Sequence, residues 1–174
     1  MNYIFSAIFL YFFLGFLLYI FQRRIVFNKS GHPGAPKDYN LDNTEEVYIK
    51  TEDNLKLLSW YHKGNNSLPL IVYFHGNSFH IGDRAYRIQR YIEKNWSVLL
   101  VSWRGFGGNK GNPTEKNLYK DAEAVLKWIK NNTEFKFKEL VIYGESLGSG
   151  AAVEMGTKYE FLSIVLEAPF TSIN

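Results

Sequence analysis

Cysteine is absent from this sequence, and its absence narrows the chemistry that the chain can perform. It excludes disulfide bonds, thiolate metal sites and a cysteine nucleophile. A strong excess of charge is also lacking, because the net charge is only +3 and no basic run alternates with aromatic residues. The composition therefore gives no indication of a nucleic-acid partner. The 174 residues, of which 46% are hydrophobic, are sufficient for one domain with a core.

Charged residues are missing from positions 3–21, where the sequence reads YIFSAIFLYFFLGFLLYIF. As a helix this segment spans about 28 Å, close to the hydrocarbon thickness of a bilayer. A buried core helix would show a polar face, whereas this segment is apolar all round. A cleaved signal peptide is less favoured, because no basic residue precedes the run and no small-residue cleavage site stands before Gln22. We therefore predict a transmembrane anchor over residues 1–25, with residues 3–21 in the membrane.

The charges next to the predicted anchor indicate its orientation. Arg23, Arg24 and Lys29 follow the apolar run, and no basic side chain precedes it. Because basic residues stay on the cytoplasmic side, we expect a single-pass protein with its C-terminal domain in the cytoplasm. Residues 26–40 are rich in Gly, Pro, Ser and Asn and are expected to link the anchor to a domain over residues 41–174.

Beyond the linker, short apolar runs alternate with helical patterns. The runs at 45–51 and 55–62 are joined by turn residues and predict a β-hairpin. Near-continuous apolar runs rich in branched residues are typical of strands buried on both faces of a parallel sheet. Such runs occur at 68–75, 96–103, 139–144 and 161–168, and helical spacing occurs at 83–94, at 115–130 and after Ser146. This order predicts an α/β fold with a mostly parallel sheet and helices on both faces.

The most informative motif is Gly-Glu-Ser-Leu-Gly, which lies between a predicted strand and a predicted helix. The Gly-x-Ser-x-Gly spacing is typical of a nucleophile elbow, in which the serine occupies a strained turn. Side chains at Gly144 and Gly148 would collide with their surroundings in such a turn. Ser146 is therefore the candidate nucleophile, and the amide of Leu147 at the helix N-terminus is a candidate oxyanion donor. The alternative is a chance match in a turn of small residues.

A second element, FHGNS, stands at the end of another predicted strand. It is expected to expose backbone amides beside the elbow. The amide of Asn77, or alternatively that of Ser78, is the candidate for the second oxyanion donor. His75 is expected to shape this turn by hydrogen bonding. His80 is expected either at the mouth of a pocket or as the cap of the next helix, and His62 at an exposed strand end.

A third element is the glycine-rich loop over residues 102–114. It lacks the Lys-Ser/Thr of a phosphate-binding loop and the spacing of a dinucleotide-binding turn. Phosphate binding is therefore not favoured. Arg104, which stands beside the glycines, is expected to anchor this loop near the site.

Together these motifs resemble the α/β-hydrolase superfamily, and more narrowly its membrane-anchored, abhydrolase-domain-containing serine hydrolases. The resemblance rests on His-Gly-Asn at 75–77, Arg-Gly-Phe-Gly at 104–107, Gly-Glu-Ser-Leu-Gly at 144–148 and Glu-Ala-Pro-Phe at 167–170, whose order and spacing agree over residues 41–173. It implies hydrolysis of an ester, thioester or amide through an acyl-enzyme on Ser146, with no cofactor and no metal. An acyl or ester small molecule or a lipid is the expected substrate class, and the anchor favours lipid esters or acylated proteins.

The triad of that family also includes an aspartate and then a histidine downstream of the serine. Neither residue type follows Ser146 in this sequence. Glu167, at the end of the last predicted strand, is expected to anchor the following loop and not to serve as the triad acid. The sequence is therefore interpreted as C-terminally truncated, and the strand at 161–168 is expected at an open edge of an incomplete sheet.

Loss of a triad histidine costs on the order of 10⁶ in turnover in serine proteases, so little or no activity is expected from this polypeptide alone. Three interpretations stay open. The chain is a membrane-anchored serine hydrolase by descent, a non-catalytic remnant or scaffold at the membrane, or a half-protein that a second polypeptide completes. The last interpretation requires that polypeptide to supply the acid and the histidine.

Overall fold

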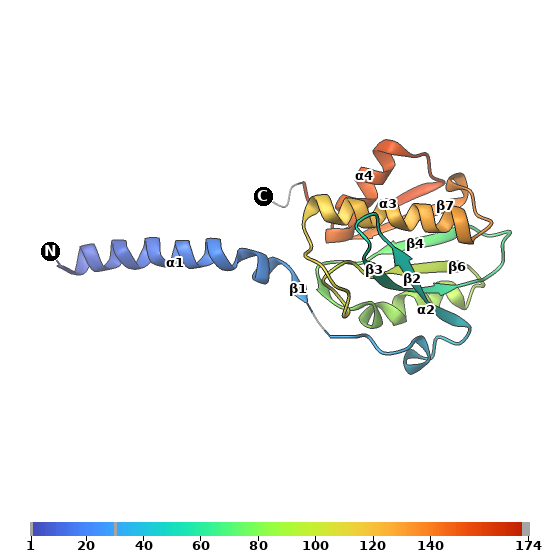
Figure 1. Ribbon diagram of the computed structural model, residues 1–174, viewed down its shortest axis with the longest axis horizontal. Helices are drawn as coiled ribbons and strands as arrows, with labels where there is room; N and C mark the ends of the chain where they lie inside the picture. The colour runs from blue at the N-terminus through green and yellow to red at the C-terminus, as the bar shows by residue number, and fades with distance from the viewer. Residues whose placement is uncertain (1, 30, 172–174) are drawn as a thin grey trace.

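The computed structural model describes residues 2–29 and 31–171 and shows an N-terminal helix joined to an α/β domain (Figure 1). Helix α1 (Asn2–Val26) extends away from the domain and exposes its large apolar side chains. Its segment Tyr3–Gln22 has a mean hydropathy of 2.4 and is long and apolar enough to cross a membrane. The helix thus coincides with the segment in which the sequence predicts a membrane anchor.

A six-stranded sheet forms the centre of the domain, in the order β2-β3-β6-β4-β7-β8. The strands are β2 (Thr44–Lys50), β3 (Lys56–His62), β4 (Leu70–Phe74), β6 (Ser97–Val101), β7 (Leu140–Glu145) and β8 (Ser163–Glu167). The β2–β3 and β3–β6 pairs are antiparallel, and the other pairs in this sheet are parallel. The predicted hairpin and the predicted mostly parallel sheet are confirmed.

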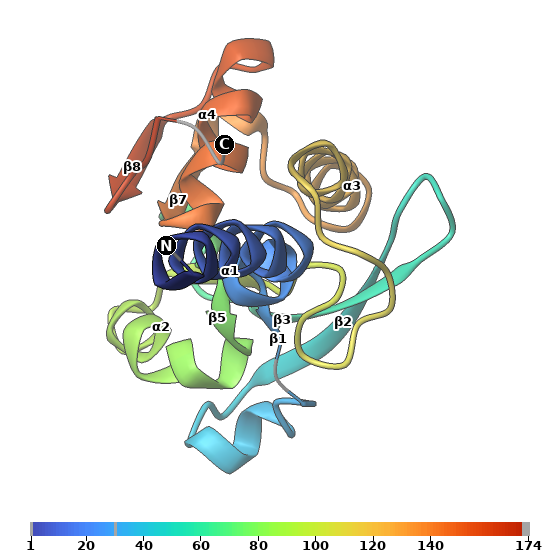
Figure 2. The same cartoon turned by 90° about the vertical axis from the view of Figure 1, so that its left-hand side faces the viewer.

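Helices cover both faces of the sheet, with α2 on one side and α3 and α4 on the other (Figure 2). Helix α3 begins where the Thr114 hydroxyl accepts a hydrogen bond from the Asn117 amide at 3.2 Å, as its position before the helix predicts. The helices are α2 (Ala85–Ile92), α3 (Glu115–Asn132) and α4 (Leu147–Lys158), with short 3₁₀ turns η1 (Pro36–Tyr39), η2 (Ile81–Arg84) and η3 (Phe137–Glu139). The predicted arrangement of helices is therefore confirmed.

Two apolar layers hold these helices against the sheet, and β6 contributes to both. Side chains alternate between the faces of a strand. Val98 and Leu100 accordingly belong to the layer that contains Ile88 of α2. Leu99 and Val101 belong to the other layer, with residues of α3 and α4. A central strand must therefore be apolar along its whole length, which is why its sequence shows no polar alternation.

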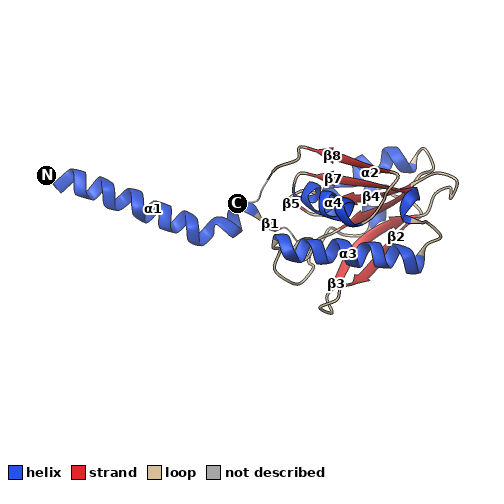
Figure 3. Ribbon diagram, turned by 90° about the horizontal axis from the view of Figure 1, so that it is seen from above, coloured by secondary structure: helices blue, strands red, loops and turns tan. Residues whose placement is uncertain are grey.

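Strand β8 lies at the edge of the sheet beside β7, as expected from the sequence (Figure 3). Its apolar side chains are far from buried. Leu162, Ile164, Val165 and Leu166 are between 38% and 55% exposed. The last described strand therefore presents apolar surface that the described part of the chain does not cover.

The segment expected to link anchor and domain contributes to the packed structure. Its two-residue strand β1 (Asn28–Lys29) pairs in parallel with β5 (Ser78–Phe79). Phe27 is 8% exposed and belongs to the apolar layer beneath α3 and α4. The chain thus enters the domain core one residue after α1 ends.

Candidate active site

Ser146 occupies a sharp corner between β7 and α4. Its backbone has φ 47° and ψ −110°, a conformation that non-glycine residues rarely adopt and that costs free energy. Three hydrogen bonds hold it there. Its amide donates a hydrogen bond to the Glu167 carbonyl at 2.8 Å, and its carbonyl accepts hydrogen bonds from the amide of Ser149 at 2.8 Å and the Ser149 hydroxyl at 2.6 Å. The corner is therefore fixed from both the sheet and the helix.

The glycines on either side of Ser146 are required by close backbone contacts. A Cβ atom on Gly148 would overlap the carbonyl of Phe74 on the neighbouring strand. A Cβ atom on Gly144 would lie 2.6 Å from the Cα of Ser149, which real side chains do not tolerate. The steric reason predicted for the Gly-x-Ser-x-Gly spacing therefore holds in the structure.

The turn after β4 lies directly against this corner. A Cβ atom built on Gly76 would stand 3.4 Å from the Ser146 Cβ. Asn77, the residue predicted to supply one oxyanion amide, follows Gly76, and Leu147, predicted to supply the other, opens α4. The structure thus brings together the segments that carry all the predicted site residues: Ser146, Leu147 and Asn77.

His75 lies in the core beneath this turn. Its side chain is fully buried, packs against the Trp103 and Phe106 rings, and donates from Nδ1 to the Gly76 carbonyl at 2.6 Å. Burial lowers the pKa of His75 to about 3, so the ring is neutral at physiological pH. The geometry fits the turn-shaping role expected of it.

The other histidines near the sheet differ in outcome. His80 is the N-cap residue of η2, and its amide donates to the Asp83 carboxylate at 3.2 Å, which favours the capping alternative. The expectation for His62 was wrong, because this side chain is only 7% exposed at the end of β3. Its ring lies 3.3 Å from the Thr44 hydroxyl, and burial lowers the pKa of His62. The paired strand β2 covers the end of β3, which the sequence pattern predicts to be exposed.

Glu145, the residue before the candidate nucleophile, is the centre of an ion-pair cluster. Arg84 donates to its two carboxylate oxygens at 3.1 and 2.8 Å, and the Tyr73 hydroxyl donates at 3.0 Å. Burial alone would raise the pKa of Glu145, but the Arg84 guanidinium outweighs it and holds the pKa below its ordinary value. Arg84 also donates to the Ser78 carbonyl at 2.7 Å. One guanidinium therefore ties the turn after β4 to the residue beside Ser146.

Glu167 holds the end of β8 in place. Its carboxylate accepts hydrogen bonds from the Tyr143 hydroxyl at 2.7 Å and from Arg87 at 2.5 Å. These two donors, Tyr143 first, lower the pKa of Glu167. This side chain is therefore engaged in anchoring, as expected, and not directed at a histidine.

Arg104 anchors the glycine-rich loop, as its surroundings in the sequence predict. Its guanidinium is 2% exposed and forms an ion pair of 2.6 Å with Asp121 on α3, which is fully buried. A second pair of 2.7 Å reaches Asp53 in the β2–β3 turn. Neither acid was predicted from the sequence. Each is far from Arg104 along the chain, so no local pattern identifies it.

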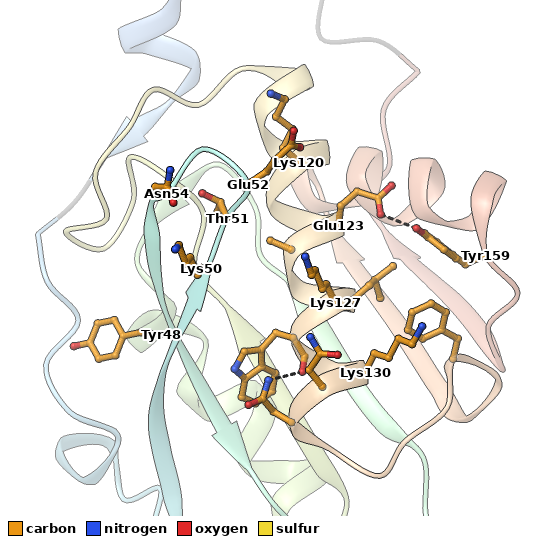
Figure 4. A pocket seen from close by; sticks show the side chains of 16 residues that line it. Tyr48, Lys50, Thr51, Glu52, Asn54, Lys120, Glu123, Lys127, Lys130 and Tyr159 are labelled. Carbon is orange, nitrogen blue, oxygen red and sulfur yellow. Dashed lines mark hydrogen bonds between the residues drawn. The ribbon is translucent and has the colours of Figure 1, made fainter.

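A hollow of about 1000 Å³ lies between the β2–β3 hairpin and α3, as Figure 4 shows. Its rim carries lysines and acids, among them Lys50, Glu52, Lys120, Glu123 and Lys127. None of the predicted site residues lines it. The chemistry that the sequence predicts therefore belongs to the corner and not to this larger hollow.

The fold and the corner define a class, namely an α/β protein with a serine at a strand-to-helix elbow. A family model described as Hydrolase_4, serine aminopeptidase S33, matches residues 66–174, which is well over half of the chain. The chain belongs to this family of α/β hydrolases.

Individual relatives agree with this assignment. An uncharacterized membrane protein of Saccharomyces cerevisiae is 30% identical over 90% of this chain and 57% of that protein. The lysophosphatidylserine lipase ABHD12 of Danio rerio is 29% identical over 79% of this chain and 42% of that protein. The structure of the Pyrococcus furiosus esterase Pf2001 matches with a TM-score of 0.67 and 27% identity, over 82% of this chain and 58% of that one. The chain spans about half the length of the curated relatives it matches.

Proposed function

We propose that this chain carries the nucleophile of a membrane-anchored serine hydrolase that acts on esters, thioesters or amides. Ser146 is the nucleophile, and the amides of Leu147 and Asn77 stabilise the oxyanion. The observation that carries the proposal is the strained backbone of Ser146 at φ 47°, pressed against the Gly76 turn. Lipase and esterase relatives support the same class of reaction.

The proposed reaction requires a base at the serine. The Ser146 oxygen attacks the acyl carbon while the base takes its proton, and the leaving group departs with a proton from that base. The base then takes a proton from a water molecule, whose oxygen attacks the acyl carbon. The bond between the acyl carbon and the serine oxygen breaks, the carboxylic acid leaves, and the serine oxygen regains a proton from the base. The corner supplies the nucleophile and the oxyanion amides, so the base is the component still to be accounted for.

The histidines of this chain all precede residue 81, and each has one ring nitrogen close to a group other than the Ser146 hydroxyl. Their ring nitrogens contact Gly34, Thr44, Gly76 and Asp83, from His32, His62, His75 and His80 respectively. We therefore propose that this polypeptide alone has little or no hydrolase activity.

We propose that a further segment, from a longer form of this chain or from a second polypeptide, completes the site. The exposed strand β8 offers an unpaired edge on which a further strand can add. Beside it, a hollow of about 450 Å³ is open over β4 and β7, with Tyr73, Arg87, Arg90, Tyr91, Lys94 and Tyr143 among its lining residues. We propose that the triad acid and histidine reach Ser146 from a segment that occupies this side of the sheet.

Membrane attachment through α1 is part of the same proposal. The exposed apolar helix and the membrane-protein relative support it. A lipid or another acyl ester held at the bilayer surface would then be close to the domain. We propose single-pass insertion with the domain on the cytoplasmic side, from the basic residues that follow the apolar run.

The activity of the chain alone is tested with a fluorophosphonate serine probe and p-nitrophenyl acetate, on the full chain in detergent micelles. We expect the same background labelling and turnover for the native chain, for Ser146→Ala and for the control Ser163→Ala on the exposed strand β8. Strong labelling that is lost in Ser146→Ala but kept in Ser163→Ala would refute the proposed inactivity.

The role of Ser146 is tested by completing the sheet. A chimera joins this chain to the part of the Saccharomyces cerevisiae relative that the match does not cover. Because a triad histidine contributes on the order of 10⁶ in turnover, we expect Ser146-dependent labelling to appear in the chimera. A folded chimera whose labelling is unchanged by Ser146→Ala would refute the assignment of the nucleophile.

A further inference from the structure

The residue that follows the anchor helix is packed beside the candidate site. Helix α1 ends at Val26, and Phe27 is already 8% exposed. The Phe27 ring meets the Phe106 ring edge to face, with centroids 6.4 Å apart. Phe106 in turn meets the ring of His75 at 5.5 Å, also edge to face. A continuous row of rings therefore leads from the end of the anchor to the turn after β4.

The backbone after Phe27 is joined to the same turn. Strand β1 pairs in parallel with β5, so that Asn28 is the partner of Ser78 and Lys29 the partner of Phe79. Strand β5 begins one residue after Asn77. Figure 2 shows β1 and β5 together below the end of α1. The residues that follow α1 thus form a strand that pairs with the segment next to the proposed oxyanion amide.

One residue of this turn has a strained backbone and an exposed side chain. Phe79 has φ 63°, in a region that favours glycine, and its side chain is 54% exposed. Within the described residues, the sheet that contains β5 has β1 as its other strand. Arg84 holds the Ser78 carbonyl from the side of Glu145. The β1 backbone is therefore a further fixed point of the turn, in addition to Arg84 and the His75 ring.

We propose that residues 27–29 are a positioning element, which holds the Gly76–Phe79 turn against Ser146. This element couples the position of the membrane anchor to the position of the site. The proposal rests on the proposed function for the role of the Asn77 amide and for the insertion of α1 in a membrane. It predicts that the segment after α1 cannot be exchanged for an arbitrary linker.

The test compares two buried phenylalanines by hydrogen exchange in the full chain, held in detergent micelles. Phe27→Ala removes the ring that packs against Phe106, and Phe135→Ala removes a ring of nearly equal exposure, 7% against 8%, in the segment between α3 and η3. We expect amide exchange in residues 76–80 to rise about tenfold in Phe27→Ala, the factor that corresponds to about 1.4 kcal/mol of lost local stability. In Phe135→Ala the exchange of residues 76–80 should stay at the native rate, although global stability falls.

A conservative variant separates positioning from general packing. Phe27→Leu keeps an apolar side chain against Phe106 and should recover most of the protection of residues 76–80. If Phe27→Ala does not fold, the milder pair Phe27→Leu and Phe135→Leu gives the same comparison with a smaller difference. Native exchange of residues 76–80 in the Phe27 variant, or an equal rise in both members of the pair, overturns the proposal. Exchange does not depend on catalysis, so this failure is distinct from an absence of hydrolase activity.

Discussion

Strands β6 and β8 have similar sequences and opposite surroundings. Both contain five residues, begin with serine and continue with branched apolar residues, as SVLLV and SIVLE. All of β6 is buried, whereas β8 is exposed up to its partly buried Glu167. The difference arises from position, because β6 lies between β3 and β4 while β8 is at the edge. Composition therefore identifies a strand, and its neighbours decide how much its side chains stabilise the fold.

The same contrast applies to the charged residues that follow the two strands. Arg104, after β6, and its partner Asp121 are 2% and 0% exposed. Glu167, the last residue of β8, and its partner Arg87 on α2 are 36% and 31% exposed. A buried ion pair whose partner is removed leaves an uncompensated charge, whereas a solvated pair contributes little. The glycine-rich loop is thus fixed far more firmly than the end of β8.

The largest expected difference comes from breaking these pairs. Asp121→Ala leaves the Arg104 guanidinium buried with only Asp53 to balance it, and should cost about 3–5 kcal/mol of unfolding free energy. Glu167→Ala should cost less than about 1 kcal/mol, because water solvates Arg87. Urea denaturation of the full chain in micelles measures both. Equal losses would show that the edge of the sheet is as tightly packed as its centre.

A smaller difference is expected from apolar truncations in the two strands. Leu100→Ala removes a fully buried side chain from β6 and should cost about 3 kcal/mol. Leu166→Ala removes a side chain that is 39% exposed on β8 and should cost about 1 kcal/mol or less. The same denaturation experiment measures both variants. A larger loss for Leu166→Ala would mean that another chain covers β8 in solution.

Much of the fold could be predicted because its signals are local. Apolar runs and helical spacing identify the strands and helices, and the glycines beside Ser146 predict a tight corner because their steric reason lies within a few residues. Partners across the sheet could not be predicted in this way. Arg84 and Glu145 meet only through the pairing of β4 with β7. Their types are ordinary for a surface, and nothing in the spacing marks them as partners.

Two other features were hidden for a related reason. Phe27 follows an apolar helix and precedes a segment rich in Gly and Pro, so the sequence shows a linker where the structure shows a core residue. His62 ends a strand, and only its distance to Thr44 on the paired strand shows that it is covered. Both depend on an element that is not adjacent in the chain. The burial of these two residues therefore depends on neighbours that are distant in the chain and not on the local sequence pattern.

The smallest expected effects concern the pH dependence of stability, which compares a buried histidine in the centre of the sheet with a carboxylate at its edge. Burial lowers the pKa of His75, after β4, to about 3, while the unfolded chain takes up this proton near pH 6.5. The unfolded state therefore gains stability as pH falls below about 6.5, at up to about 1.4 kcal/mol per pH unit. The pKa of Glu167 is lowered by its hydrogen bonds, so its contribution is present above about pH 4.3 and is lost below it.

Stability measured between pH 7 and pH 5 therefore reports on the buried histidines and not on the edge. We expect His75→Gln to reduce the slope of the unfolding free energy against pH in this range, and Glu167→Gln to leave that slope unchanged. His62, whose pKa is also lowered by burial, accounts for part of the remaining slope. An unchanged slope in His75→Gln would mean that this ring takes up a proton in the folded chain, and that the turn it shapes is open to water. The end of β4, beside the Ser146 corner, would then be accessible to water as the edge strand β8 is, although β4 lies in the centre of the sheet.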